Sequence, residues 1–284
     1  MPKFFASHVL FFLLLLAPFN ALTQTSNQVA RKFDEFGDIQ YSDLIARLDN
    51  FAVLIQDEPT SKGFIFVYRT RRDLPGLSNR LALLSKKYLT TSRGLSDDRV
   101  VTIDGGVGPC LTQELWIVPA GTTPKVRRDA YPRGLSYFAP KKFDELSFSL
   151  PSDMNESGSI DGSDDPKIYL EGFADELRRE ARSRGYIIVY GEYYIERGSV
   201  GDAKGRQKEY ARPRLDSPVT ARLTLRQIQN ALINTYHIPM RRISLVDGGY
   251  RKVRSIELWI VPRGEHPPIP TPNSFPRERA LSRR

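Results

Sequence analysis

Apolar residues recur along the chain in alternating helical and strand-like patterns. Residues 44–55 place an apolar side chain at every third or fourth position, with charged residues between, which predicts an amphipathic helix. The run FIFVY at 64–68 is apolar on both faces and predicts a central strand. A second helical stripe follows at 77–89, and strands follow at 100–104 and 114–119. The first stripe consists of Leu44, Leu48, Phe51, Ala52 and Ile55.

This pattern occurs twice. The hexapeptide ELWIVP at 114–119 returns at 257–262 and contains the only two tryptophans, Trp116 and Trp259. The halves match at a shift of 143 residues around the hexapeptide, and at shifts of 122 and 110 residues further upstream. With a short strand at 33–39, each copy has the order β-α-β-α-β-β. We therefore predict an α/β fold of two tandem two-layer sandwiches with mixed sheets and helices on one face.

The shifts and the composition divide the chain into segments. The second copy carries two loop insertions, and a basic segment separates the copies. The tail has too few apolar residues to fold and is predicted to be extended or disordered. The segments are a signal peptide (1–24), the first repeat (25–119), a basic, proline-containing linker (120–142), the second repeat (143–262) with insertions near 153–166 and 195–216, and a proline-rich basic tail (263–284).

Several single residues carry expectations of their own. The first helix of each repeat is predicted to end near Gly63 or Gly185, because glycine readily takes the left-handed conformation. Asp104 and Asp247 each precede two glycines, which predicts a turn. These aspartates are either ligand contacts at a strand end or turn residues whose carboxylates accept hydrogen bonds from nearby amides. Cys110, the one cysteine, is predicted to be a small buried strand residue.

The N-terminal residues predict export. Lys3 is followed by an uncharged apolar run at 9–19, which is shorter than the roughly 20 residues needed to span a bilayer. A cleaved signal peptide is the favoured interpretation, and a retained membrane anchor is the alternative. The expected location is the periplasm or cell envelope.

The net charge of +9 does not indicate a nucleic-acid-binding face. Residues 25–119 hold 12 basic and 12 acidic side chains, and residues 143–262 hold 18 of each. The excess lies in the linker, the tail and Lys3. The linker and the tail could contact anionic lipid or glycan peripherally at low salt.

The sequence gives little support for catalysis. Outside the signal peptide only His237 and His266 remain, and no hydrolase, zinc-protease or phosphate-loop motif occurs. The acidic insertion near 153–166 lacks the spacing of a calcium loop. No enzymatic activity, cofactor or metal is expected. The repeated tryptophans either stack on a sugar ring or belong to the core.

The element order, the helix sequence LSNRLALLSKKYL (77–89) and the YGE at 190–192 together resemble the OmpA-like domain, which is the C-terminal, peptidoglycan-associating domain of bacterial outer-membrane proteins. The resemblance covers roughly 33–119 and 143–262. Its motifs would match Gly191, the Asp-Gly-Gly segments, and the acids Glu114 and Glu257.

The ligand positions of this family differ here. The resemblance implies an aspartate and an arginine that clamp the diaminopimelate of the wall peptide. At the aspartate position this chain has Arg71 or Arg72 in one copy and Tyr193 or Tyr194 in the other. At the arginine position stand Leu81 and Thr224, and Arg80, Arg222 and Arg226 lie close by on other helical faces. A cation in place of the carboxylate repels an ammonium ligand, so the usual clamp is expected to fail.

Two functions remain after these exclusions. The first is a non-catalytic, exported envelope protein that binds peptidoglycan or another anionic envelope polymer through the loops between the second strand and the second helix. The alternative is a protein–protein adaptor that binds its partner through the proline-rich basic tail. The candidate binding residues are Arg71, Arg72, Arg80, Gly191, Tyr193, Tyr194, Arg222, Arg226, Asp104 and Asp247.

Overall fold

The computed structural model describes residues 29–125, 127, 129–130, 137–148, 166–201, 207–215 and 218–273. The predicted signal peptide and nearly all of the acidic insertion near 153–166 lie outside the described residues. Among the helices that the structure describes, none combines the length and the apolar character needed to cross a membrane.

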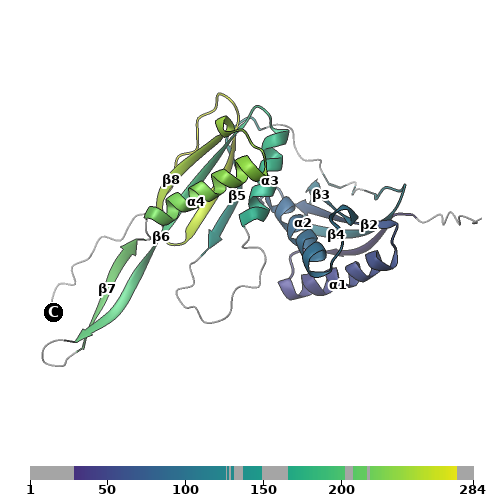
Figure 1. The fold of residues 1–284 in the computed structure, drawn as a ribbon, viewed down its shortest axis with the longest axis horizontal. Coiled ribbons are helices and arrows are strands. Elements are labelled where there is room, and N and C mark those ends of the chain that lie inside the picture. Colours follow the sequence, from purple (N-terminus) through teal and green to yellow (C-terminus); the bar gives the residue numbers. More distant parts are fainter. Residues whose placement is uncertain are drawn as a thin grey trace, which may run out of the picture.

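The first repeat forms the predicted order of elements, β-α-β-α-β-β (Figure 1). Helix α2 continues into a single π-helical turn, and a short 3₁₀ turn precedes the third strand. The elements are β1 (Arg31–Phe36), α1 (Tyr41–Asp57), β2 (Ser61–Arg69), α2 (Leu77–Lys87), the π-helical turn (Tyr88–Ser92), the 3₁₀ turn (Asp97–Arg99), β3 (Val100–Val107) and β4 (Thr112–Pro119).

The second repeat has the same order with one strand added. Its second strand is twice as long as that of the first repeat, and the added strand β7 pairs with the distal part. The elements are β5 (Lys141–Phe148), α3 (Pro166–Arg179), β6 (Arg184–Gly201), β7 (Gln207–Leu215), α4 (Pro218–Asn230), a π-helical turn (Ala231–Thr235), a 3₁₀ turn (Met240–Arg242), β8 (Ile243–Arg251) and β9 (Arg254–Val261).

Both sheets are mixed and have equivalent strand orders. The first sheet runs β1-β4-β2-β3, and the second runs β5-β9-β6 with β8 on the other side of β6. In each sheet the last two strands of the order pair in parallel, while the other neighbours are antiparallel. The register is conserved as well: Lys32 lies opposite Trp116, and Lys142 lies opposite Trp259. The predicted α/β fold with mixed sheets is therefore confirmed.

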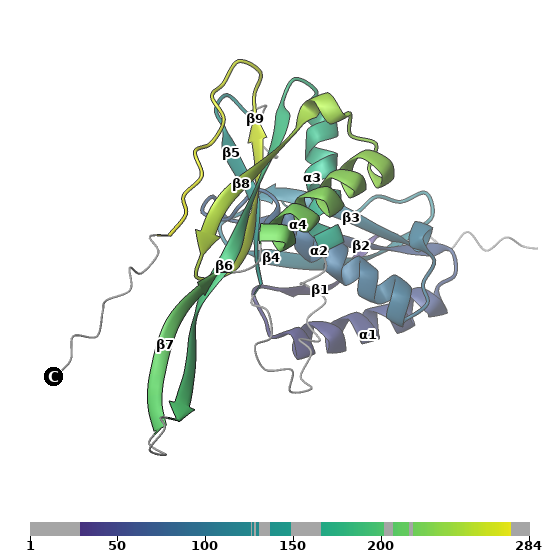
Figure 2. The ribbon, with the colours of Figure 1, turned by 60° about the vertical axis from the view of Figure 1, so that its left-hand side comes forward.

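The helices cover one face of each sheet, as Figure 2 shows for α3 and α4. All five residues of the predicted stripe at 44–55 are buried, as are those of its counterpart at 170–177. The two helix-covered cores are largely separate, although Ile168 of α3 joins the core of the first repeat. On the other face of the first sheet, Phe66, Tyr68 and Trp116 form a second apolar cluster.

Direct contacts join the two repeats. The backbone N–H of Gly76, just before α2, donates to the carbonyl of Phe143 in β5 at 2.8 Å. Arg80 of α2 forms an ion pair with Asp144 at 3.1 Å, and its guanidinium lies 4.8 Å from the ring centroid of Tyr169 in α3. The first turns of α2 therefore pack against the first strand and first helix of the second repeat.

Three local predictions are wrong in an informative way. Helices α1 and α3 end at Asp57 and Arg179, whereas Gly63 and Gly185 lie within or at the start of the following strands. A side chain at Gly63 would meet Ile55 within 2.4 Å, so this glycine lets helix and strand approach each other.

The insertion near 195–216 is predicted as a loop, but most of it forms the β6–β7 ribbon, which projects from the body (Figure 1). Cys110 is exposed between β3 and β4 and is not a buried strand residue.

Candidate functional site

The loop between β2 and α2 borders an open hollow of about 540 Å³ in the first repeat. Arg71 and Arg72, both exposed, line this hollow together with the β3–β4 turn and Asp129 of the linker. The loop is held by its own hydrogen bonds: the N–H of Thr70 donates to Asp73 at 2.7 Å, and the N–H of Arg72 donates to the Thr70 hydroxyl at 3.2 Å. Two predicted candidates are therefore together on an ordered loop beside a concave surface.

The corresponding region of the second repeat is a projecting ribbon. Gly191 is buried, and a side chain there would meet the Tyr250 ring at 2.9 Å, so its role is to admit that ring. Tyr193 is buried, whereas Tyr194 is 52% exposed. On the ribbon itself Arg214 donates to Glu196 at 2.6 Å. The two repeats thus present a hollow and a ribbon at equivalent positions.

The other predicted arginines do not join the hollow. Arg80 is held by Asp144 of the second repeat, as described above. Arg222 and Arg226 lie exposed on α4. Of the five candidate arginines, only Arg71 and Arg72 line the hollow.

Asp104 and Asp247 support their own strands. Each carboxylate accepts a hydrogen bond at 3.0 Å from the N–H two residues later, that of Gly106 or Gly249. These glycines have positive φ values of 87° and 80°. The segment lies inside β3 or β8, so the turn predicted there is a bulge within a strand. Of the two roles considered for these aspartates, the geometry supports the structural one.

The glycine between the aspartate and the positive-φ glycine makes room for an aromatic ring. A side chain at Gly105 would meet the Tyr68 ring at 2.4 Å, and one at Gly248 would meet the Tyr190 ring at 2.5 Å. The repeated Asp-Gly-Gly therefore serves a repeated tyrosine on the sheet face opposite the helices.

A buried ion pair on that same face was not anticipated from the sequence. The carboxylate of Glu114 is fully buried and accepts from Lys32 Nζ at 2.7 Å and from Trp116 Nε1 at 2.8 Å. Lys32 also contacts Glu35 at 2.6 Å. Because the pair sits against an aromatic surface, breaking it would leave a charge without solvent.

The second repeat contains the same arrangement. Glu257 accepts from Lys142 at 2.7 Å and from Trp259 Nε1 at 3.0 Å, and Lys142 contacts Glu145 at 2.8 Å. Lys142 lies 5.6 Å from the Trp259 ring centroid, the same separation as between Lys32 and Trp116. The two tryptophans therefore make equivalent polar contacts, although Trp116 is buried and Trp259 is half-buried, and neither is an exposed stacking surface.

The second cation of each cluster is an arginine, and it comes from a different part of the chain in each repeat. In the first repeat Arg127 of the linker lies 3.1 Å from Glu35 and 4.0 Å from Glu114. In the second, Arg251 at the end of β8 lies 3.0 Å from Glu145 and 2.9 Å from Glu257.

The pKa shifts follow from these contacts. Burial alone would lower the pKa of Lys32, but its hydrogen bonds to Glu114 and Glu35 outweigh this and raise the pKa above its ordinary value. Burial would raise the pKa of Glu257, but hydrogen bonds from Lys142, Trp259 and Arg251 hold it below its ordinary value. The pKa of Lys142 is raised in the same way by its hydrogen bonds to Glu145 and Glu257, against the opposing effect of burial. Lys32, Lys142 and Glu257 are thus suited to permanent charge pairing and not to proton transfer near neutral pH.

The chain segment after each last strand lies against the same sheet face. The N–H of Arg127 donates to the Tyr68 hydroxyl at 3.5 Å, and the N–H of Thr271 donates to the Tyr190 hydroxyl at 3.0 Å. Arg251 further donates to the Thr271 hydroxyl at 2.7 Å. The described part of the tail, 263–273, is therefore extended and attached to its own sheet, while residues after 273 lie outside the described part.

The comparison with known sequences identifies no relative: no protein-family model and no curated protein matches the chain. Within the described residues, no group of three or more histidine, cysteine, aspartate or glutamate side chains is arranged to hold a metal. The candidate site therefore consists of the hollow at Arg71 and Arg72 and the ribbon that replaces it in the second repeat.

Proposed function

We propose that this chain is a non-catalytic, exported binding protein of the cell envelope that holds peptidoglycan or another anionic envelope polymer at the hollow of the first repeat. The observation that carries the proposal is the pair of exposed arginines, Arg71 and Arg72, beside a concave surface of about 540 Å³. Export and location rest on the apolar N-terminal run, which lies outside the described residues.

The sheet face opposite the helices is a less favourable binding surface than the loops at the strand ends. On the face opposite the helices, each repeat pairs its charged groups internally and is contacted by the following chain segment. A polymer would have to displace those contacts to bind there. At the hollow, by contrast, no carboxylate among the described residues lies within ion-pair distance of the Arg72 guanidinium.

A guanidinium binds carboxylates and other oxyanions through two parallel hydrogen bonds. The carboxylates of wall peptides and acidic glycans have this chemistry. The diaminopimelate clamp is not part of the proposal, because the position of its aspartate carries cations here. The contacts of Thr271 and Asn273 with Tyr190, Arg251 and Lys252 do not favour the adaptor alternative, because a partner that binds this part of the tail would have to displace them.

A sedimentation experiment tests the proposal. Purified residues 25–284 are incubated with insoluble peptidoglycan at low salt and centrifuged, together with the variants Arg72→Glu and Lys62→Glu. Both variants exchange one exposed cation for an acid, but only Arg72 borders the hollow, whereas Lys62 lies near the start of β2. We expect the wild type and Lys62→Glu to sediment and Arg72→Glu to lose about tenfold in affinity.

Cys110 supplies an independent readout. It is the only cysteine, is exposed, and adjoins Pro109, which lines the hollow. A fluorophore on Cys110 should report wall fragments entering the hollow. Absence of wild-type sedimentation at low salt, or equal sedimentation of the Arg72→Glu variant, would contradict the proposal.

A further inference from the structure

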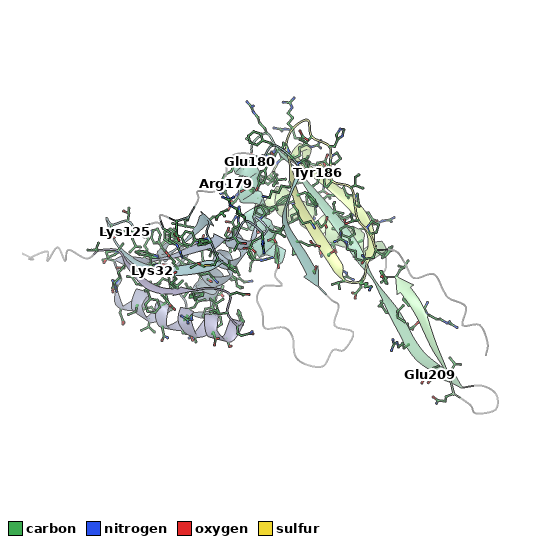
Figure 3. The ribbon with its side chains drawn as sticks, turned by 180° about the vertical axis from the view of Figure 1, so that it is seen from behind. Lys32, Lys125, Arg179, Glu180, Tyr186 and Glu209 are labelled. Carbon is green, nitrogen blue, oxygen red and sulfur yellow. The ribbon has the colours of Figure 1, made fainter. Side chains whose placement is uncertain are left out.

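A second hollow, of about 620 Å³, lies at the opposite end of the second sheet, where β6 begins and β9 ends. Figure 3 labels Tyr186 and Glu180 near this end and Glu209 far away on the ribbon. Glu265 is the one carboxylate that lines it. The arginines that line it are Arg182, Arg184, Arg241, Arg242 and Arg263.

One of these arginines is structural. Arg242 donates to the carbonyls of Leu177, Glu180 and Ser183 at 2.6, 2.7 and 2.8 Å, and so satisfies the end of α3 and the turn after it. In the first repeat Arg99 makes the same contacts to Ile55, Glu58 and Ser61. This arginine is therefore required by the fold in both repeats.

The other arginines are not required in this way. Arg182, Arg241 and Arg263 are exposed, and none has a carboxylate within ion-pair distance among the residues that the structure describes. Arg184 lies over the Tyr186 ring at 5.9 Å and donates to the Ser244 hydroxyl at 3.3 Å.

The first repeat shows what the fold needs at these positions. The residues equivalent to Arg182, Arg241 and Arg263 are Thr60, Asp98 and Ala120, all exposed. A hydrogen bond with the Ser96 hydroxyl is the main cause that holds the pKa of Asp98 below its ordinary value. The nearby charge of Lys62, which is equivalent to Arg184, lowers this pKa further. The first repeat thus balances its charge at this end, whereas the second accumulates cations.

This accumulation is unfavourable without a counter-ion. Burial, and then the neighbouring charge of Arg241, lower the pKa of the Arg242 guanidinium. Like charges gathered around a concave surface repel one another and attract a multivalent anion.

We propose that this hollow is a binding site for phosphate groups, with Arg182, Arg241 and Arg263 as its ligands and Arg184 beside them. Guanidinium groups pair with phosphate oxygens through two hydrogen bonds, and a phosphate monoester carries up to two charges on one centre. The site is separate from the hollow at Arg71 and Arg72 and goes beyond the proposed function. Together the two hollows would let one chain contact two anionic components.

Replacing the arginines by their first-repeat counterparts tests the site. The probe is inorganic pyrophosphate, titrated calorimetrically at low salt into residues 25–284. We expect the wild type to bind and the variant Arg182→Thr, Arg241→Asp, Arg263→Ala to bind at least tenfold more weakly, with an unchanged circular dichroism spectrum because the three positions are exposed. Citrate, a carboxylate of similar charge, should bind the wild type more weakly than pyrophosphate.

The reciprocal variant is the matched control. Thr60→Arg, Asp98→Arg, Ala120→Arg places the same cations at the same positions of the first repeat, and we expect it to gain a second pyrophosphate site. The proposal would be overturned if the wild type does not bind pyrophosphate, or if the triple arginine replacement binds it within about twofold of the wild type. It would also be overturned if the reciprocal variant gains no site, or if the wild type binds citrate as tightly as pyrophosphate.

Vesicles distinguish the two sources of phosphate. Co-sedimentation with phosphatidylglycerol vesicles but not with phosphatidylcholine vesicles, lost in the triple arginine replacement, assigns the site to lipid headgroups. Pyrophosphate binding without co-sedimentation assigns it to soluble phosphate compounds. The Arg72→Glu variant should bind pyrophosphate normally, so failure at one hollow is distinguishable from failure at the other.

Discussion

The two repeats solve one electrostatic problem with different residues. Each buries a glutamate beneath a lysine and a tryptophan, and each brings an arginine to the same place. In the second repeat that arginine is Arg251 of β8, at 2.9 Å from Glu257. In the first repeat the equivalent position is Gly108, and Arg127 reaches over from the linker to 4.0 Å from Glu114. The requirement is a positive charge at this point of the sheet, wherever the chain supplies it.

The largest expected effect comes from removing the lysines. We expect Lys32→Met to destabilise the first repeat by about 3–5 kcal/mol, because Glu114 then stays fully buried with the Trp116 indole and only a distant arginine. Lys142→Met should destabilise the second repeat clearly less, because Glu257 keeps its ion pair with Arg251 at 2.9 Å. The free energy of unfolding is measured in urea.

The repeats can be monitored separately because each has one tryptophan. Lys32→Met is measured against a Trp259→Phe background, and Lys142→Met against a Trp116→Phe background. The double variant Lys32→Met, Glu114→Met should recover most of the loss, since an apolar pair leaves no unpaired charge. Equal losses in the two repeats would show that the arginine does not matter.

The contact between the repeats provides the second comparison. Asp34 and Asp144 occupy equivalent positions, but Asp34 pairs with Arg47 of its own repeat, whereas Asp144 is 1% exposed and pairs with Arg80 of the other repeat. Burial raises the pKa of Asp144 to about 6, against the opposing effect of Arg80. One carboxylate oxygen of Asp144 has no hydrogen-bond partner among the described residues, which is consistent with a group that readily keeps its proton.

This predicts a pH dependence of stability. The folded pKa of Asp144, about 6, lies above its ordinary value of 3.8, so the folded state binds the proton more tightly. The resulting stabilisation is fully present below about pH 4 and is lost as the pH rises through 6, by up to about 3 kcal/mol. Asp144→Asn should remove this difference when unfolding is compared at pH 4 and pH 7.5.

Asp34→Asn is the matched control. Its pair with Arg47 is partly exposed, so the substitution should change stability by less than about 1 kcal/mol. If the difference between pH 4 and pH 7.5 is the same in wild type and Asp144→Asn, the buried carboxyl does not titrate in this range.

The sequence predicts the fold well because the fold depends on local periodicity. The apolar stripes at 44–55 and 170–177 locate the first helices, and the repeated hexapeptide locates the last strands with their shared register. The predicted helix ends at Gly63 and Gly185 are wrong, because those glycines are selected for close packing between helix and strand and not for backbone conformation.

The candidate site is predicted less well, because it depends on contacts between distant residues. The loop arginines Arg71 and Arg72 are together, as expected for neighbours in sequence. Arg80 is used by the other repeat, which no pattern within one repeat could indicate. The buried Lys–Glu pairs had a usable signal, since Lys32, Glu35 and Glu114 all recur unchanged as Lys142, Glu145 and Glu257. The contact of Arg127 had no such signal. The residue that takes its place in the second repeat is Arg251, which aligns with Gly108 and not with Arg127.

The smallest expected effect concerns a hydrogen bond that both repeats contain, partly buried at Asp104 and exposed at Asp247. Asp104 and Asp247 accept the same 3.0 Å hydrogen bond from Gly106 or Gly249. Replacing either aspartate by alanine should lower the free energy of unfolding by about 1 kcal/mol, the net value of one such hydrogen bond. The loss should be similar in the two repeats. Asparagine retains the acceptor oxygen and should restore most of the stability. If Asp104→Asn is as destabilising as Asp104→Ala, the charge and not the hydrogen bond is what the bulge needs, and a ligand-binding role for these aspartates becomes the better explanation of their recurrence.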